Sequence, residues 1–128
     1  MTPTEPFLTL ATNAVAEQTT SRITGTIVDD AGVAIPASAL VTLTLTLYNR
    51  RGPTILNSRD NVSVLNTNGG TVDSAGKFAM TLDPADNPLS AGFSSEQHAA
   101  LFTWTYNSGA ATGRAVVEFT VSNLAFVP

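Results

Sequence analysis

The chain has 128 residues, of which 43% are hydrophobic and 12% are charged, and its formal net charge is −4. This length suits a single domain with its own core, and the hydrophobic share excludes a chain that is disordered along its length. The absence of cysteine excludes disulfides and thiolate metal sites, and no basic tract supplies the electrostatic attraction that nucleic-acid binding needs. Nineteen threonines against a single lysine favour β structure.

Targeting signals are absent from the sequence. No apolar run approaches the roughly 18 residues that a membrane-spanning helix needs. The first thirty residues lack the basic region and the long apolar region of a secretory signal. We therefore expect synthesis in a cytoplasm and neither a membrane nor a nucleic acid as partner.

Residues 1–18 differ from the rest of the chain. Two early prolines interrupt any helix, and Phe7, Leu8 and Leu10 form a short apolar patch. We expect an extended N-terminal arm that packs on a neighbouring subunit, because these side chains are unfavourable in water. A frayed terminus and an arm that folds back on its own domain are the alternatives. The domain itself is expected to span residues 19–128.

From residue 19 onward, apolar and polar residues alternate in short runs that turn signals separate. The clearest run is Val41–Tyr48, in which the leucines share one face and the threonines the other. The predicted strands are 22–28, 41–48, 54–59, 61–65, 77–82, 99–107 and 114–122. The segments 54–59 and 61–65 are two weaker strands or one bent strand. About seven or eight such strands predict an all-β, antiparallel, immunoglobulin-like β-sandwich, with a small barrel as the rival architecture.

The same alternation predicts a core and a long irregular connection. The predicted core residues are Leu43, Leu45, Leu47, Phe102, Trp104, Val117 and Phe119. The connection at 83–98 contains two prolines and a glycine, so it is not a regular strand. Asp83 and Pro84 have the pattern of a helix start, with aspartate as the cap and proline in the first position. A second helical turn is possible near Ser94 or Ser95.

The polar residues do not form a recognisable catalytic motif. His98 is the only histidine, and we interpret it as a solvated loop residue or a hydrogen-bonded strand cap. Asp29 and Asp30 offer oxygen ligands for calcium, but their sequence is typical of a turn. A hydrolase would need two carboxylates among Asp83, Asp86 and Glu96 to converge, whereas we expect them to be separated and solvated. The prediction is a protein that is not an enzyme and has no catalytic, cofactor or metal site.

Two resemblances follow from the strand pattern. The stretch Gly25–Pro36 resembles the opening hairpin of bacterial Ig-like and carboxypeptidase-regulatory-like domains, although Ser38-Ala39 stands where those domains have Gly-Ala. Most of the chain resembles small Ig-like virion proteins of tailed bacteriophages. The matching segments are Leu43–Tyr48, Ile55–Arg59, Val64–Asn66, Thr71–Gly76, Met80–Pro84 and His98–Tyr106. This resemblance implies a structural virion protein, made in the host cytoplasm, that decorates the capsid or sits at the head–tail region.

Such a protein works through protein–protein interaction, with other virion structural proteins or with copies of itself as partners. The candidate interface residues are Phe7, Leu8, Leu10, Phe93, Leu124, Phe126 and Val127. The alternative function is a carbohydrate-binding or host-surface adhesion module. It would use Phe93, the one aromatic residue expected in a loop, with the polar residues 94–97 beside it.

Overall fold

The computed structural model describes residues 8–10, 14–16, 19–51, 54–89 and 95–122. Within them lie ten strands and two short 3-10 turns, and none of the described residues is α-helical. The strands are β1 (Leu8–Leu10), β2 (Ala14–Ala16), β3 (Ser21–Thr26), β4 (Leu40–Asn49), β5 (Thr54–Ile55), β6 (Val62–Ser63), β7 (Gly70–Val72), β8 (Lys77–Leu82), β9 (Ser95–Tyr106) and β10 (Ala111–Ser122). The turns are η1 (Ala37–Ala39) and η2 (Pro84–Asp86). No helix in this part of the chain is long and apolar enough to cross a membrane.

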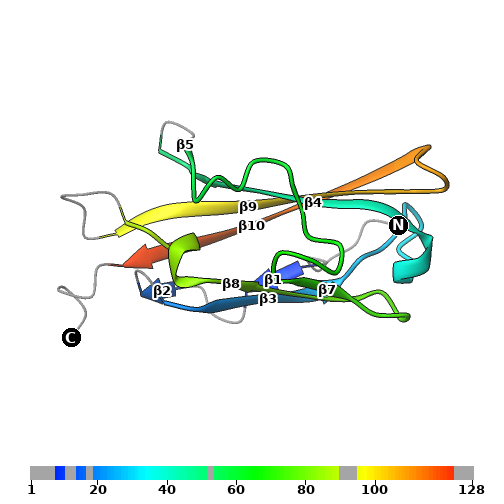
Figure 1. Ribbon diagram of the computed structural model, residues 1–128, viewed down its shortest axis with the longest axis horizontal. Coiled ribbons are helices and arrows are strands. Elements are labelled where there is room, and N and C mark those ends of the chain that lie inside the picture. The colour runs from blue at the N-terminus through cyan, green and yellow to red at the C-terminus, as the bar shows by residue number, and fades with distance from the viewer. Residues whose placement is uncertain (1–7, 11–13, 17–18, 52–53, 90–94, 123–128) are drawn as a thin grey trace.

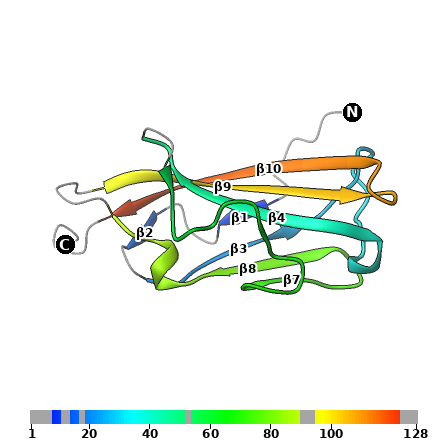
Figure 2. The same cartoon turned by 45° about the horizontal axis from the view of Figure 1, so that its top comes forward.

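The strands form two sheets that lie one above the other (Figures 1 and 2). The four-stranded sheet has the order β1-β3-β8-β7, and all its neighbours are antiparallel. The six-stranded sheet has the order β2-β10-β9-β4-β5, with β6 also paired to β4. In this second sheet only β2 and β10 run parallel. The chain is therefore an all-β protein of two packed layers, as its composition predicts.

The core fills the space between the two sheets, because each long strand alternates inward apolar residues with outward polar ones. All seven predicted core residues are buried, and Trp104 is only 1% exposed. Phe78 of β8 meets Phe102 of β9 across the two sheets, edge to face, with ring centroids 5.2 Å apart. The prediction of the core is confirmed.

The long predicted strands exist, but their ends differ from the prediction. The segment predicted at 77–82 is β8 with the same bounds, and η2 begins after Asp83 as its cap pattern indicates. β9 begins at Ser95, so the helical turn expected at this residue is wrong. β7 was not predicted, because its three residues are too few to show alternation. It follows a turn in which Asn68 and Gly69 both have positive φ, at 52° and 95°.

The segment predicted as an N-terminal arm contributes two strands to the sheets of its own chain. β1 pairs antiparallel with β3, and β2 pairs parallel with the end of β10. This corresponds to the alternative in which the terminus folds back on its own domain. Residues 1–7, 11–13 and 17–18 lie outside the described residues.

Candidate functional site

The outer face of the six-stranded sheet is the largest regular surface that the long strands build. The Leu-Thr alternation of β4 turns its leucines into the core and its threonines outward. Cross-strand register then places Thr105 between Thr42 and Thr112, and Thr103 beside Thr44. The hydroxyl oxygens of Thr42 and Thr105 lie 2.7 Å apart, within hydrogen-bond distance. We call this surface of β4, β9 and β10 the threonine face.

Charge is scarce on the threonine face. Arg114 and Glu118, both on β10, are the only charged side chains that the three strands direct outward. Glu118 forms an ion pair with Arg50, which follows β4, and both side chains are about half exposed. No carboxylate among the described residues pairs with Arg114. The face therefore bears mostly hydroxyl groups and is rich in β-branched side chains, which lose little freedom on binding.

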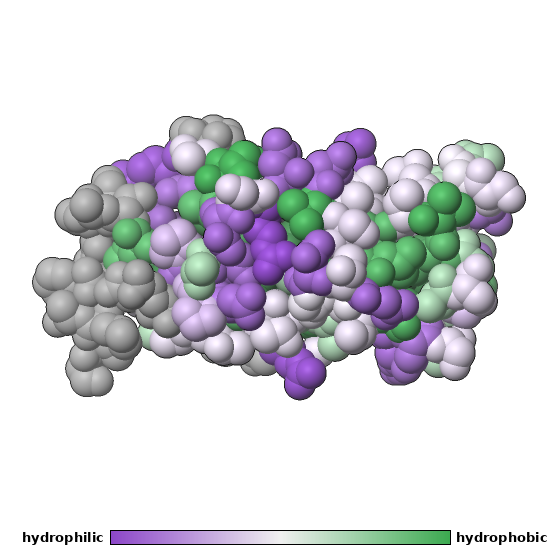
Figure 3. All heavy atoms as spheres, in the orientation of Figure 1, coloured by the Kyte–Doolittle hydropathy of each residue, from purple (hydrophilic) through white to green (hydrophobic). Residues whose placement is uncertain are grey.

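Exposed large hydrophobic residues are few and scattered over the described part of the chain. They are Val33 in the β3–β4 connection, Val41 of β4, Ile55 of β5 and Val116 of β10. In Figure 3 hydrophilic residues cover the middle of the visible side, and hydrophobic residues gather toward the end that carries η1. Val116 is 49% exposed and lies between Arg114 and Glu118 on the same face of β10. Val116 is therefore an exposed apolar side chain on the threonine face with a charged residue on each side of it along β10.

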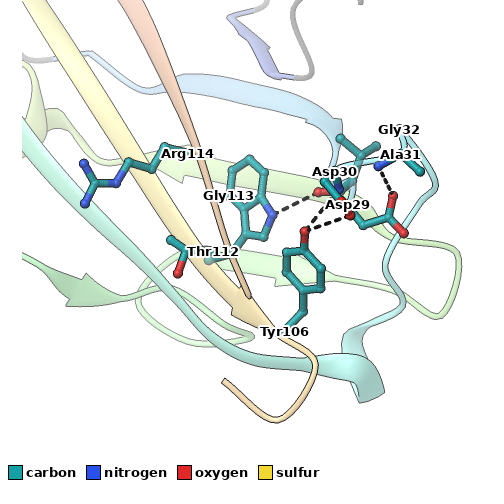
Figure 4. Close-up of a pocket in the computed structure, with 10 residues that line it drawn as sticks. Asp29, Asp30, Ala31, Gly32, Tyr106, Thr112, Gly113 and Arg114 are labelled. Atoms are coloured by element: carbon teal, nitrogen blue, oxygen red, sulfur yellow. Dashed lines mark hydrogen bonds between the residues drawn. The ribbon is translucent and has the colours of Figure 1, made fainter. Parts of the chain in front are cut away.

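A cavity of about 390 Å³ opens at the end of the sandwich, between residues 28–32 and the start of β10. Its polar groups largely satisfy one another (Figure 4). The Tyr106 hydroxyl accepts a hydrogen bond from the Asp30 backbone N–H, and Asp29 Oδ1 accepts from Ala31 and Val33. Arg114 points away from both aspartates. The turn predicted at Asp30–Gly32 is thus confirmed, and the Asp29 carboxylate holds the loop.

Trp104 closes the inner wall of this cavity. Its indole N–H donates to the Val28 carbonyl at 3.0 Å, which links β9 to the connection that follows β3. Gly113 is its cross-strand partner, and a Cβ at Gly113 would lie 2.4 Å from Trp104 Nε1. Only glycine therefore leaves room for the indole. Because Trp104 and Tyr106 are 1% and 6% exposed, neither ring presents a face to a ligand.

A buried ion pair joins the irregular segment after β5 to η2. Asp86 is fully buried, and its carboxylate accepts two hydrogen bonds from Arg59, at 2.8 and 2.9 Å. It also accepts from Asn57 and from the Asp83 backbone N–H. Burial alone would raise the pKa of Asp86, but these hydrogen bonds bring it below its ordinary value. The expectation that Asp86 is solvated is wrong, because the carboxylate neutralises a buried arginine.

Glu96 and His98 form a second buried pair on β9. His98 Nε2 lies 2.7 Å from Glu96 Oε1, and both side chains are almost fully buried. The imidazole also packs edge to face on Phe119. The expectations that His98 is solvated or caps a strand and that Glu96 is solvated are wrong. A signal was present, because both residues continue the inward phase of Trp104 and Phe102 in steps of two.

The candidate interface residues predicted from the sequence fall mostly beyond the described part of the chain. Phe7, Phe93, Leu124, Phe126 and Val127 lie outside it. Leu8 and Leu10 belong to β1, of which the backbone pairing is described. Among the described residues, no three histidine, aspartate or glutamate side chains group closely enough to hold a metal ion.

Comparison of the chain with protein-family models, with curated proteins and with solved structures found no match.

Proposed function

We propose that the chain is an immunoglobulin-like sandwich that serves as a non-enzymatic structural virion protein of a tailed phage. The strand order supports the fold. In the standard naming, β3, β8 and β7 correspond to strands B, E and D, and β4, β9 and β10 correspond to C, F and G. β1 beside β3 and β2 beside β10 correspond to an A strand divided between the two sheets.

The observation that carries the function is the threonine face. Protein interfaces are depleted of charged residues at their centres. The only charged side chains that the three long strands of this sheet direct outward are Arg114 and Glu118. The hydroxyl rows at Thr44 and Thr103 can exchange hydrogen bonds with a partner without burying an ion. We propose that this face binds a capsid or head–tail neighbour in the particle.

The alternative, a carbohydrate-binding or adhesion module, has less support. Sugar binding by stacking needs an exposed aromatic ring with polar neighbours. The aromatic residues of the end cavity, Trp104 and Tyr106, are buried, and they are joined to the protein's own loop. Phe93 lies outside the described residues.

The test has two stages. Mass spectrometry of purified particles from the host culture should detect the chain, and its absence from them would end the virion proposal. Particles should then be grown with Thr44→Arg, which places a charge on the threonine face between Thr103 and Ser63 and away from Arg114. Thr24→Arg on the outer face of the four-stranded sheet is the matched control, because Thr24 is also an outward strand residue.

We expect Thr44→Arg to lower incorporation by about tenfold or more, since a charge inside an interface is costly, while Thr24→Arg incorporates normally. Both variants should keep the melting temperature of the parent, because both sites face outward. Equal incorporation of the two variants would refute the threonine face as the binding surface.

A further inference from the structure

Over most of its length, one edge of β10 has no strand partner among the described residues. On one side β10 pairs with β9 through all twelve of its residues, from Ala111 to Ser122. On the other side, β2 pairs with Thr120–Ser122 alone among the described residues. Figure 2 shows β2 beside the C-terminal end of β10 only. Nine residues, 111–119, thus present one edge of their backbone without a described ladder partner.

This edge has few of the features that prevent strands from associating. Edge strands are usually shortened, bulged, interrupted by proline or given inward charges. β10 is twelve residues long, contains no proline, and keeps an unbroken register with β9. Its inward residues Val117 and Phe119 are apolar and buried. Such an edge is a template for another strand.

The outward side chains of β10 match those of a second copy of the same strand. We propose that two copies of the chain associate through their β10 edges, antiparallel, about a twofold axis at Val116. In this register residue i faces residue 232 − i, so Arg114 of each copy faces Glu118 of the other. Val116 faces its own counterpart, which covers an exposed apolar side chain. The contact is isologous and closes as a dimer.

Neighbouring registers lack this charge match. An axis at Arg114 sets two guanidinium groups against each other, and an axis at Glu118 sets two carboxylates together. With the axis at Val116 the two strands pair over residues 113–119, because β2 already occupies the edge of Thr120–Ser122. Axes at the residues on either side of Val116 pair Val116 with a charged residue. The twofold at Val116 is therefore the register in which both charges of β10 find opposite partners.

The local ion pairs leave both residues available for this contact. Arg114 is exposed and has no ion-pair partner among the described residues. Glu118 contacts Arg50 on the side of β9 and β4, whereas a second copy approaches β10 from its open edge. The carboxylate has two oxygens and can accept from two guanidinium groups.

Sedimentation equilibrium of the purified full chain tests the proposal. Because the contact is small, we expect a weak dimer with a dissociation constant between about 10 μM and 1 mM. Arg114→Glu sets like charges together twice and should weaken the dimer about tenfold or more. The double variant Arg114→Glu/Glu118→Arg restores opposite charges and should recover affinity to within about threefold of the parent.

Arg22→Glu on β3 is the matched control, because it makes the same charge change at an exposed outward position of the other sheet. It should leave the dissociation constant unchanged, and circular dichroism should show the same fold for every variant. A parent chain that stays monomeric up to about 1 mM would overturn the proposal. So would an Arg114→Glu variant that dimerises like the parent, or a double variant that remains as weak as Arg114→Glu. The measurement uses no phage particle, so its outcome is independent of the virion proposal.

Discussion

Replacing Asp86 by asparagine keeps the shape of a buried side chain and removes its charge. In the folded protein the Asp86 carboxylate accepts hydrogen bonds from Arg59, Asn57 and the Asp83 backbone. Asparagine has one acceptor oxygen in place of two, and its NH2 group only donates, so it cannot accept from the guanidinium. Arg59, only 8% exposed, then keeps its positive charge without a counter-charge.

The expected cost of Asp86→Asn follows from that uncompensated arginine. Breaking a buried ion pair by removing one partner costs about 3–5 kcal/mol. In a chain of this size such a loss lowers the melting temperature by roughly 10 °C or more. Part of the loss can be offset, because Arg59 also donates to the Asn68 carbonyl at 3.0 Å. The lower part of the range is therefore expected.

Urea denaturation followed by circular dichroism measures this cost, with Asp60→Asn as the control. Asp60 is adjacent to Arg59 in sequence and is exposed, so its neutralisation should change the free energy of unfolding by less than about 0.5 kcal/mol. If Asp86→Asn lowers the free energy of unfolding by less than about 1 kcal/mol, the ion pair between Arg59 and Asp86 contributes little to stability, and the reasoning is refuted.

Three further outcomes are expected. Because the pKa of Asp86 is lowered on folding, its contribution is complete above the unfolded value near 3.9 and is lost as pH falls through the folded value. Acid titration of stability should therefore show a component below about pH 4 that Asp86→Asn lacks. Trp104→Ala should cost about 3–5 kcal/mol in urea denaturation, and a loss under about 1 kcal/mol would contradict its core position. Gly113→Ala should cost about 1–3 kcal/mol, because its Cβ overlaps the indole, and an unchanged melting temperature would refute that contact.

The alternating strands were the part of the fold that the sequence could predict. In β4 the leucines and threonines differ strongly in hydropathy, so the period of two is visible over eight residues. The core residues of β9 and β10 follow from the same signal. β7 could not be found in this way, because its three residues become a strand by pairing with β8.

The two buried polar pairs show why the candidate sites could not be predicted equally well. Arg59 is one of five arginines, and it is buried because Asp86, 27 positions further along the chain, reaches it through η2. Nothing in the local sequence of the irregular segment around Arg59 indicates this partner. Glu96 and His98 did have the phase of inward residues. Because both of these neighbouring inward positions are polar, a hydropathy pattern does not identify this part of β9 as buried.

The threonine face and the edge of β10 that is proposed to dimerise both belong to β10, so binding at one affects binding at the other. A twofold axis perpendicular to the sheet keeps the outer faces of both copies on the same side. The threonine faces of a dimer then form one continuous surface, and a neighbour in the particle would meet both copies at once. Two linked contacts hold far more tightly than one, because the second binds at high effective concentration.

Thr44→Arg should therefore reduce incorporation into particles and leave the sedimentation dimer intact, since Thr44 lies on β4 and β9 separates it from β10. Arg114→Glu should weaken the dimer and also lower incorporation, and Arg114→Glu/Glu118→Arg should recover both together. If the double variant regains the dimer while incorporation stays low, Arg114 contacts the neighbour directly. Dimerisation would then not account for its effect on particles.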